Sequence, residues 1–348
     1  MTAPRYTKID LDATRYYHCM TRCVRRSYLC GRDMHTGQDF EHRKGWLVTR
    51  IKQLSSIFAI KICAYAVMSN HYHLVLYVNE SEAKAWKNND IIERWAALFP
   101  RDAAKLDGPF VTEHLVDSKV ALWRERLMSI SWFMRCINET IAKFSNEEDN
   151  CTGRFWEGRF KSQALLDEGA LLATMAYVDL NPIRAKIAST PEESEFTSIY
   201  ERIKEAAKSI NKKKDSVKAS KQVSPSEAVA KLCDKAKQPS SLVPFANGNP
   251  LNDFPAIDFR LSDYLQLVDT TGRILRENKR GVIPEHLSPI LTRLKLTSTG
   301  WFEMVKNLEQ HFYHAVGHIV ILAEFGSQYR MRKPRGTKAA KKCYLHAA

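Results

Sequence analysis

Residues 64–78 read AYAVMSNHYHLVLYV, two apolar runs separated by the turn-like dipeptide Ser69-Asn70. Short runs rich in β-branched and aromatic residues are typical of strands. The sequence therefore predicts one strand over residues 61–68 and a second over residues 71–78, paired as a hairpin.

The histidines of the second strand are the first candidates for chemistry. Side chains alternate between the two faces of a strand, so His71 and His73 share a face and Tyr72 points to the other. Two imidazoles on one rigid face can both reach a divalent cation, although Mg²⁺ or Mn²⁺ needs further ligands that include oxygens. The spacing alone leaves a second interpretation open, in which one histidine is buried and hydrogen-bonded and the other lies on the surface.

The segments around the hairpin complete an α+β pattern. Apolar spacing predicts a tyrosine-rich strand, an amphipathic helix, the hairpin, a second helix capped by Ser129, a further strand and a last helix. These elements cover residues 15–29, 46–58, 61–78, 129–144, 154–166 and 168–182. The order β-α-β-β-α-β-α predicts a ferredoxin-like antiparallel sheet with helices packed on one face.

The remaining sequence suggests three parts. Residues 1–200 form the α+β domain, with an insertion at about residues 79–126 that contains some helix. Residues 201–252 are rich in lysine, serine and alanine and are expected to be a basic flexible linker. Residues 253–348 show helical spacing and end in a basic tail, which predicts a separate helical module.

Composition favours a polyanionic partner. The chain of 348 residues carries a formal net charge of +14, and a basic protein gains affinity for nucleic acid by releasing condensed counterions. An ordinary basic protein is the alternative that charge alone leaves open. No apolar signal core or membrane-spanning stretch is present, and the eight cysteines form no Cys-x-x-Cys pair. These features predict a cytoplasmic protein with reduced thiols and no membrane partner.

The last helix of the domain adds further candidates. Tyr177 and Asn181 are four residues apart and share a helical face, and Arg184 follows three residues later. Pro182 is expected to end or kink the helix at Asn181. The alternatives are ordinary: Tyr177 as a packing residue, and Asn181-Pro182 as a simple helix stop.

Three motifs in this order resemble one known family. They are MSNHYHL at residues 68–74, GRFKS at residues 158–162 and YVDLNPIRA at residues 177–185. Together they resemble the REP-associated tyrosine transposases, a domesticated bacterial branch of the single-tyrosine HUH transposases of insertion sequences. The resemblance covers roughly residues 14–200, and residues 79–126 are longer than the family pattern leads one to expect.

The resemblance implies a site and a reaction. Tyr177 would be the catalytic nucleophile, and His71, His73 and Asn181 would hold a divalent metal, Mg²⁺ or Mn²⁺. The implied activity is metal-dependent cleavage and strand transfer of single-stranded DNA through a 5′-phosphotyrosine, at palindromic repeats that fold into hairpins. No nucleotide cofactor is expected, and the protein would be associated with the bacterial nucleoid.

Basic residues flanking the motifs are the expected DNA contacts, although each could be a solvated surface charge. They are Arg22, Arg25, Arg26, Arg154, Arg159, Lys161 and Arg184. The aromatic residues Phe155, Trp156 and Phe160 are candidates for stacking on unpaired bases.

Two other functions remain open at this point. A rolling-circle replication initiator would use the same residues, although neither a helicase motif nor a Walker loop is present. An inactive, repurposed DNA-binding protein is the second alternative, which the presence of every expected site residue disfavours. A plasmid relaxase is disfavoured because its tyrosine precedes the histidines, whereas Tyr177 follows them. The sequence leaves the oligomeric state open.

Overall fold

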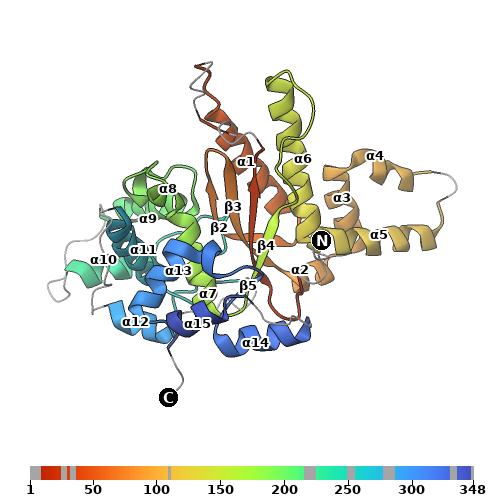
Figure 1. Cartoon of the computed structure of the whole chain (residues 1–348). Helices are drawn as coiled ribbons and strands as arrows, with labels where there is room; N and C mark the ends of the chain where they lie inside the picture. The colour runs from red at the N-terminus through yellow and green to blue at the C-terminus, as the bar shows by residue number, and fades with distance from the viewer. Residues whose placement is uncertain are drawn as a thin grey trace.

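A five-stranded sheet forms the centre of the molecule (Figure 1). The computed structural model describes residues 9–24, 30–31, 37–108, 111–214, 225–248, 255–276, 287–329 and 335–345. The strand order is β2-β3-β1-β4-β5. The strands are β1 (Tyr16–Arg22), β2 (Ile60–Val67), β3 (His71–Val78), β4 (Lys161–Leu165) and β5 (Ala315–Val316).

The first four strands confirm the predicted α+β class. Neighbours among β1 to β4 are antiparallel, and β5 joins β4 in parallel. Helix α1 (His42–Ile57) connects β1 to β2, and α6 (Ile130–Glu148) precedes β4. This is the predicted β-α-β-β-α-β order, and β3 has the predicted bounds. Strand β4 is shorter than predicted, because residues 154–160 form no strand.

Helices cover both faces of the sheet, so the prediction of helices on one face is wrong. Tyr72 donates a 2.7 Å hydrogen bond to Asn138 of α6. The next residue, His73, lies with its ring 5.7 Å from the ring of Tyr177 in α7 (Glu168–Asp179). Because adjacent residues of a strand point to opposite faces, α6 and α7 lie on opposite sides. Most of β3 is buried, and a sheet buried on both faces needs a layer on each.

Helix α7, which carries Tyr177, ends just before Asn181, where the sequence predicted a break. Asp167 caps α7 by accepting a 2.7 Å hydrogen bond from the Ala170 amide. Leu180 then leaves helical geometry, and α8 (Asn181–Arg184) begins with Pro182 in its first turn. The missing amide of proline is tolerated at this position because the first amides of a helix have no partner within it.

The insertion is helical. It contains α2 (Glu80–Ala85), α3 (Asn88–Leu98), α4 (Pro100–Ala103) and α5 (Glu113–Met128), and α3 to α5 lie to the right of the sheet in Figure 1. Trp95 of α3 and Trp123 of α5 stack with their ring centres 5.4 Å apart, and both are buried. Trp95 also lies 5.6 Å from Trp132 of α6, so these aromatic residues join the insertion to the hydrophobic core of the sheet domain.

Much of the expected linker is helical. Residues after the domain form α9 (Ser198–Lys214) and α10 (Pro225–Asp234). Arg202 of α9 is fully buried and donates 2.9 Å hydrogen bonds to the carbonyls of Cys63 and Val243. Val243 in turn donates a backbone hydrogen bond to Ile62 of β2. Arg202 and Val243 thus join this segment to the sheet, which differs from the expected flexible linker over residues 201–252.

The helices from residue 255 onward pack on the rest of the molecule rather than standing apart. They are α11 (Leu261–Arg276), α12 (Ser288–Arg293), α13 (Ser298–His311), α14 (Ile319–Gln328) and α15 (Thr337–Cys343). Tyr264 of α11 donates a 2.6 Å hydrogen bond to Asp179 of α7, and β5 extends the sheet. One continuous hydrophobic core includes residues from both parts. Among the described residues, no helix is both long and apolar enough to cross a membrane.

Candidate active site

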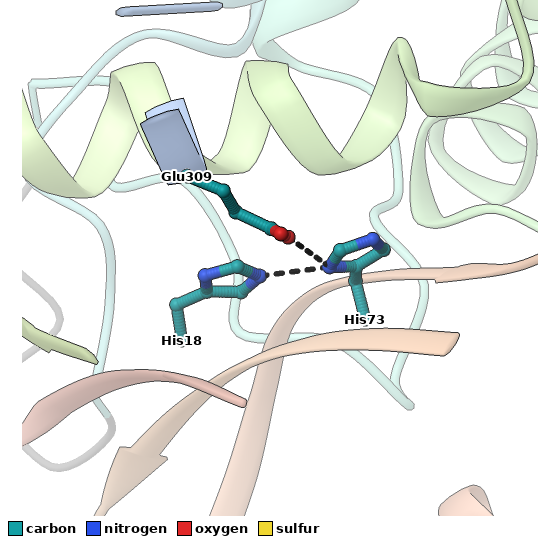
Figure 2. Close-up of side chains that lie close together, drawn as sticks. All are labelled: His18, His73 and Glu309. Carbon is teal, nitrogen blue, oxygen red and sulfur yellow. Dashed lines mark hydrogen bonds and ion pairs between the residues drawn. The ribbon is translucent and has the colours of Figure 1, made fainter. Parts of the chain in front are cut away.

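Three buried polar side chains form a row across adjacent strands. Gln163 of β4 is the direct partner of His18 in β1, and the Oε1 atom of Gln163 lies 2.7 Å from Nδ1 of His18. Nε2 of His18 lies 2.9 Å from Nδ1 of His73 in β3. Figure 2 shows the two imidazoles side by side, with Glu309 reaching them from the helical layer. His73 thus belongs to a network that the spacing of His71 and His73 alone does not reveal.

His71 extends this network at the end of β3. Its ring centre lies 4.9 Å from that of His73, which confirms that the two side chains share a face. Nδ1 of His71 lies 2.6 Å from Oδ1 of Asn70. Its Nε2 atom is therefore the nitrogen left to act as a ligand when the ring is neutral.

Burial keeps the three histidines neutral. It lowers the pKa of His73 well below the usual value, lowers that of His71 to about 4, and lowers that of His18. Nearby positive charge, from Arg22 and Arg184, acts in the same direction on His71. Neutral imidazole is the form that binds metal ions, so these residues are ready to act as ligands at neutral pH.

Tyr177 lies directly over the histidines. Its ring centre is 5.7 Å from that of His73 and 6.0 Å from that of His18, both edge-on. The guanidinium carbon of Arg184 lies 3.7 Å from the centre of the Tyr177 ring. Burial raises the pKa of the phenol, the positive charge of Arg184 opposes this, and the carboxylate of Glu309 raises the pKa further. The break after α7 brings Arg184 back over the tyrosine.

Glu309 of α13 supplies an acidic group that the sequence did not suggest. One of its oxygens lies 3.8 Å from Nδ1 of His73. Ligand atoms of His18, His73 and Glu309 all lie within 4.8 Å of one another. Two neutral imidazoles and a carboxylate are a donor set that suits a divalent transition metal. This buried group could hold a metal ion.

Asn181 begins α8 and is buried, with only 6% of its surface exposed. Its Nδ2 atom has no hydrogen-bond partner among the described residues. The contacts given above join the histidines to Tyr177 and Glu309, and none of them includes Asn181. Its expected role as a ligand stays a prediction.

A cavity of about 500 Å³ opens beside His18 and Glu309. Its lining includes Arg154, Arg159 and Lys161, three of the basic residues that the sequence indicated. The structure thus brings these side chains to the same cavity as His18 and Glu309. The cavity offers positive charge within reach of the same site.

The other expected DNA contacts that the structure describes are not among the residues that line this cavity. Arg22 is exposed at the end of β1, paired across the sheet with His71, and Arg184 lies over Tyr177. Arg25 and Arg26 lie outside the described residues.

Two of the three expected stacking residues belong to the core. Phe155 and Trp156 are buried, and the Trp156 indole donates a 2.8 Å hydrogen bond to the Asn138 carbonyl. They are therefore packing residues, because the apolar face of α6 must be covered. Phe160 is half-buried and lines the cavity.

Comparison with known proteins adds little. No protein-family model matches this sequence, and no curated protein matches it. The chain is similar to a solved structure of a REP-associated tyrosine transposase bound to a REP hairpin, with a TM-score of 0.36 and 13% identity. The match covers 59% of this chain and 86% of that one. A likeness of this size assigns neither a family nor an activity.

Proposed function

We propose that this protein is a metal-dependent enzyme that nicks and rejoins single-stranded DNA, as a single-tyrosine transposase does. One observation carries the proposal: Tyr177 lies edge-on over His18 and His73 while Arg184 covers its ring. A tyrosine nucleophile for phosphoryl transfer needs a metal or cation to stabilise the developing charge and a positive group to stabilise its own phenolate. The motifs at residues 68–74 and 177–185 favour the same chemistry.

The reaction exchanges one phosphate ester for another. The Tyr177 oxygen forms a bond to phosphorus while the bond between phosphorus and the 3′ oxygen of the preceding nucleotide breaks. Glu309, whose carboxylate acts on the Tyr177 phenol, accepts the phenol proton and passes it to solvent, while the 3′ oxygen takes up a proton from solvent and leaves as a hydroxyl. A second 3′-hydroxyl reverses the step and joins strands, because the phosphotyrosine conserves the ester energy. Arg184 favours both directions by stabilising the phenolate, which is both nucleophile and leaving group.

The buried nitrogens of the site fit a divalent cation. Among the described residues, Nε2 of His73 has no hydrogen-bond partner, and neither does the amide nitrogen of Asn181. A turn of the Asn181 amide would present its oxygen as a ligand atom. We assign His71 and His73 as the imidazole ligands and Asn181 as an oxygen ligand of Mg²⁺ or Mn²⁺. Such a cation would polarise the scissile phosphate and stabilise the charge on its oxygens.

The basic cavity is the proposed path of the DNA strand. Arg154, Arg159 and Lys161 line it next to His18, and positive groups of this kind position phosphates. The proposed substrates are palindromic repeats that fold into hairpins. A replication initiator with the same residues is the second candidate; cleavage of plasmid origins but not of hairpin repeats would favour it.

Replacement of Tyr177 by Phe tests the proposal. The wild-type protein, incubated with labelled single-stranded hairpin DNA and Mg²⁺ or Mn²⁺, is expected to form a covalent adduct that survives denaturing electrophoresis. Tyr177→Phe removes the nucleophilic oxygen and should abolish the adduct while the fold is kept. An adduct that persists in this variant would overturn the assignment.

The metal is tested in the same assay. Chelation with EDTA should stop cleavage, and added Mg²⁺ or Mn²⁺ should restore it. The double variant His71→Ala and His73→Ala should not be restored by either ion. Undiminished nicking by the double variant would end the metal model.

A further inference from the structure

The orientation of the Gln163 side chain is fixed by a backbone carbonyl. Its Nε2 atom lies 2.8 Å from the carbonyl oxygen of Phe312. A carbonyl oxygen can only accept a hydrogen bond, so the nitrogen of the amide must face Phe312 and the oxygen must face His18. The residue is buried between β1 and the segment that follows α13, with only 6% of its surface exposed.

This orientation determines which nitrogen of each histidine carries a proton. Oε1 of Gln163 accepts from Nδ1 of His18 over 2.7 Å, so the Nε2 atom of a neutral His18 bears only a lone pair. Nδ1 of His73 lies 2.9 Å from that lone pair and must donate to it. The Nε2 atom of His73 is then deprotonated, and it is buried with no partner among the described residues.

We propose that Gln163 and His18 are positioning residues that hold His73 in the tautomer whose Nε2 lone pair faces a metal ion. The identity of that metal ion rests on the proposed function, whereas the tautomer of His73 does not. Outer partners of this kind orient a metal-ligating histidine and fix its tautomer in many metal sites. Here three successive hydrogen bonds lead from His73 through His18 and Gln163 to the carbonyl of Phe312. The segment after α13 therefore determines which nitrogen of His73, a residue of β3, is free to bind a metal ion.

The competing arrangement makes His18 a ligand itself. A metal bound between Nε2 of His18, Nδ1 of His73 and Glu309 would place the proton of His73 on Nε2. That N–H group would be buried without an acceptor, which costs free energy. The proposed arrangement instead leaves a lone pair there, which a metal ion satisfies.

The tautomer can be read without metal or DNA. The full-length protein, labelled with ¹⁵N at histidine and free of metal, gives two-bond ¹H–¹⁵N correlations that distinguish protonated from unprotonated ring nitrogens. Wild-type His73 is expected to show a protonated Nδ1 and an unprotonated Nε2. In Gln163→Leu, His18 loses its acceptor and can donate from Nε2, so the protonated fraction of His73 Nε2 should rise.

Two further variants, His18→Leu and Tyr17→Phe, complete the tautomer measurement. His18→Leu removes the acceptor of His73 altogether and should also release the tautomer. Tyr17→Phe is the matched control, because Tyr17 is the neighbour of His18 on the opposite face of β1 and its hydroxyl bonds to Asp10. It removes the two part-buried hydrogen bonds between the Tyr17 hydroxyl and the Asp10 backbone, and it leaves Gln163, His18 and His73 unchanged. A protonated Nε2 in wild-type His73, or an unchanged tautomer in both Leu variants, would overturn the inference.

Metal titration provides the second readout. Mn²⁺ affinity, measured by electron paramagnetic resonance, should fall about 10- to 100-fold in Gln163→Leu and stay near wild type in Tyr17→Phe. Zn²⁺, used as a diamagnetic probe, should shift the Nε2 resonance of His73. Shifts of the His18 Nε2 and His73 Nδ1 resonances would instead identify His18 as a ligand and overturn the inference. A wild-type protein with the expected tautomer that binds Mn²⁺ but never cleaves DNA would refute the proposed function alone.

Discussion

Arg184 covers the ring of Tyr177 at 3.7 Å and also donates a 2.8 Å hydrogen bond from Nη1 to the carbonyl of Lys306 in α13. One side chain therefore connects the short helix α8, the tyrosine of α7 and a C-terminal helix. The carbonyl holds the guanidinium in place, and the positive charge of the guanidinium lowers the pKa of the phenol. Its position suits a group that stabilises a phenolate.

Removal of Arg184 should slow the chemical step and shift its pH dependence. Burial already raises the pKa of Tyr177, and Arg184 opposes that rise. Arg184→Ala should therefore raise the pKa further, so that adduct formation at neutral pH slows by roughly tenfold for each unit of the rise. The pH profile of the single-turnover adduct rate should move to higher pH.

Arg184→Lys is the control for that experiment, because it keeps a positive charge without the planar guanidinium. It should retain a profile closer to that of wild type than Arg184→Ala does. An Arg184→Ala profile that coincides with wild type would show that the guanidinium does not act on the phenol. Thermal melts of all three proteins would separate this effect from a loss of folding.

Replacement of Glu309 by Gln should separate two roles of its carboxylate. If Glu309 accepts the phenol proton, the adduct rate falls about 10²- to 10⁴-fold while Mn²⁺ affinity stays unchanged. We expect this result, because its oxygen is 3.8 Å from His73 Nδ1, a nitrogen whose hydrogen bond goes to His18. A large loss of Mn²⁺ affinity would instead identify Glu309 as a ligand.

The basic cavity should contribute to DNA affinity through phosphate contacts. Arg154→Ala, Arg159→Ala and Lys161→Ala should each weaken binding of single-stranded DNA and lower the slope of log affinity against log salt by about 1. Lys84→Ala is the matched control, because Lys84 is exposed on α2 of the insertion and pairs with Glu80. Equal slopes for the cavity variants and wild type would place the DNA elsewhere.

The hydrogen bond between Tyr264 and Asp179 should stabilise the docking of α11 on α7. The carboxylate of Asp179 is fully buried, and it accepts hydrogen bonds from Tyr264, from the Ser198 hydroxyl and from the Ile199 amide. Tyr264→Phe leaves one carboxylate oxygen without its donor, which should cost about 1–3 kcal/mol of unfolding free energy.

Urea unfolding followed by circular dichroism measures the difference. Tyr313→Phe serves as the control, because 53% of the surface of Tyr313 is exposed. That variant should unfold at the wild-type urea concentration. Coincident unfolding curves for all three proteins would show that the contact adds nothing to stability.

The local parts of the fold and site could be predicted from sequence, because their signals lie within one element. Alternation along residues 71–78 predicts both the strand and the shared face of His71 and His73, and Pro182 predicts the helix break. His18, Gln163 and Glu309 could not be found this way. Their meeting depends on the register of β1 with β3 and β4, and on where α13 packs.

Composition was misleading in the second half of the chain. The lysine-rich stretch after residue 200 suggested a solvated linker, yet Arg202 within it is buried and bonds to two carbonyls. Only a fold that supplies those carbonyls makes such a buried cation favourable. The helical spacing over residues 253–348 predicted helices there but carried no information about what the polar face of α13 contacts.

The bond from Gln163 to the carbonyl of Phe312 also has a consequence for synthesis. Protein chains are made from the N-terminus, so β1, β3, β4 and Tyr177 all leave the ribosome well before residue 312. The acceptor that orients Gln163 appears only after all of these parts. A nascent chain thus carries the histidines and Tyr177 before it can set the tautomer of His73, and the row of polar groups is completed only once residue 312 has been made.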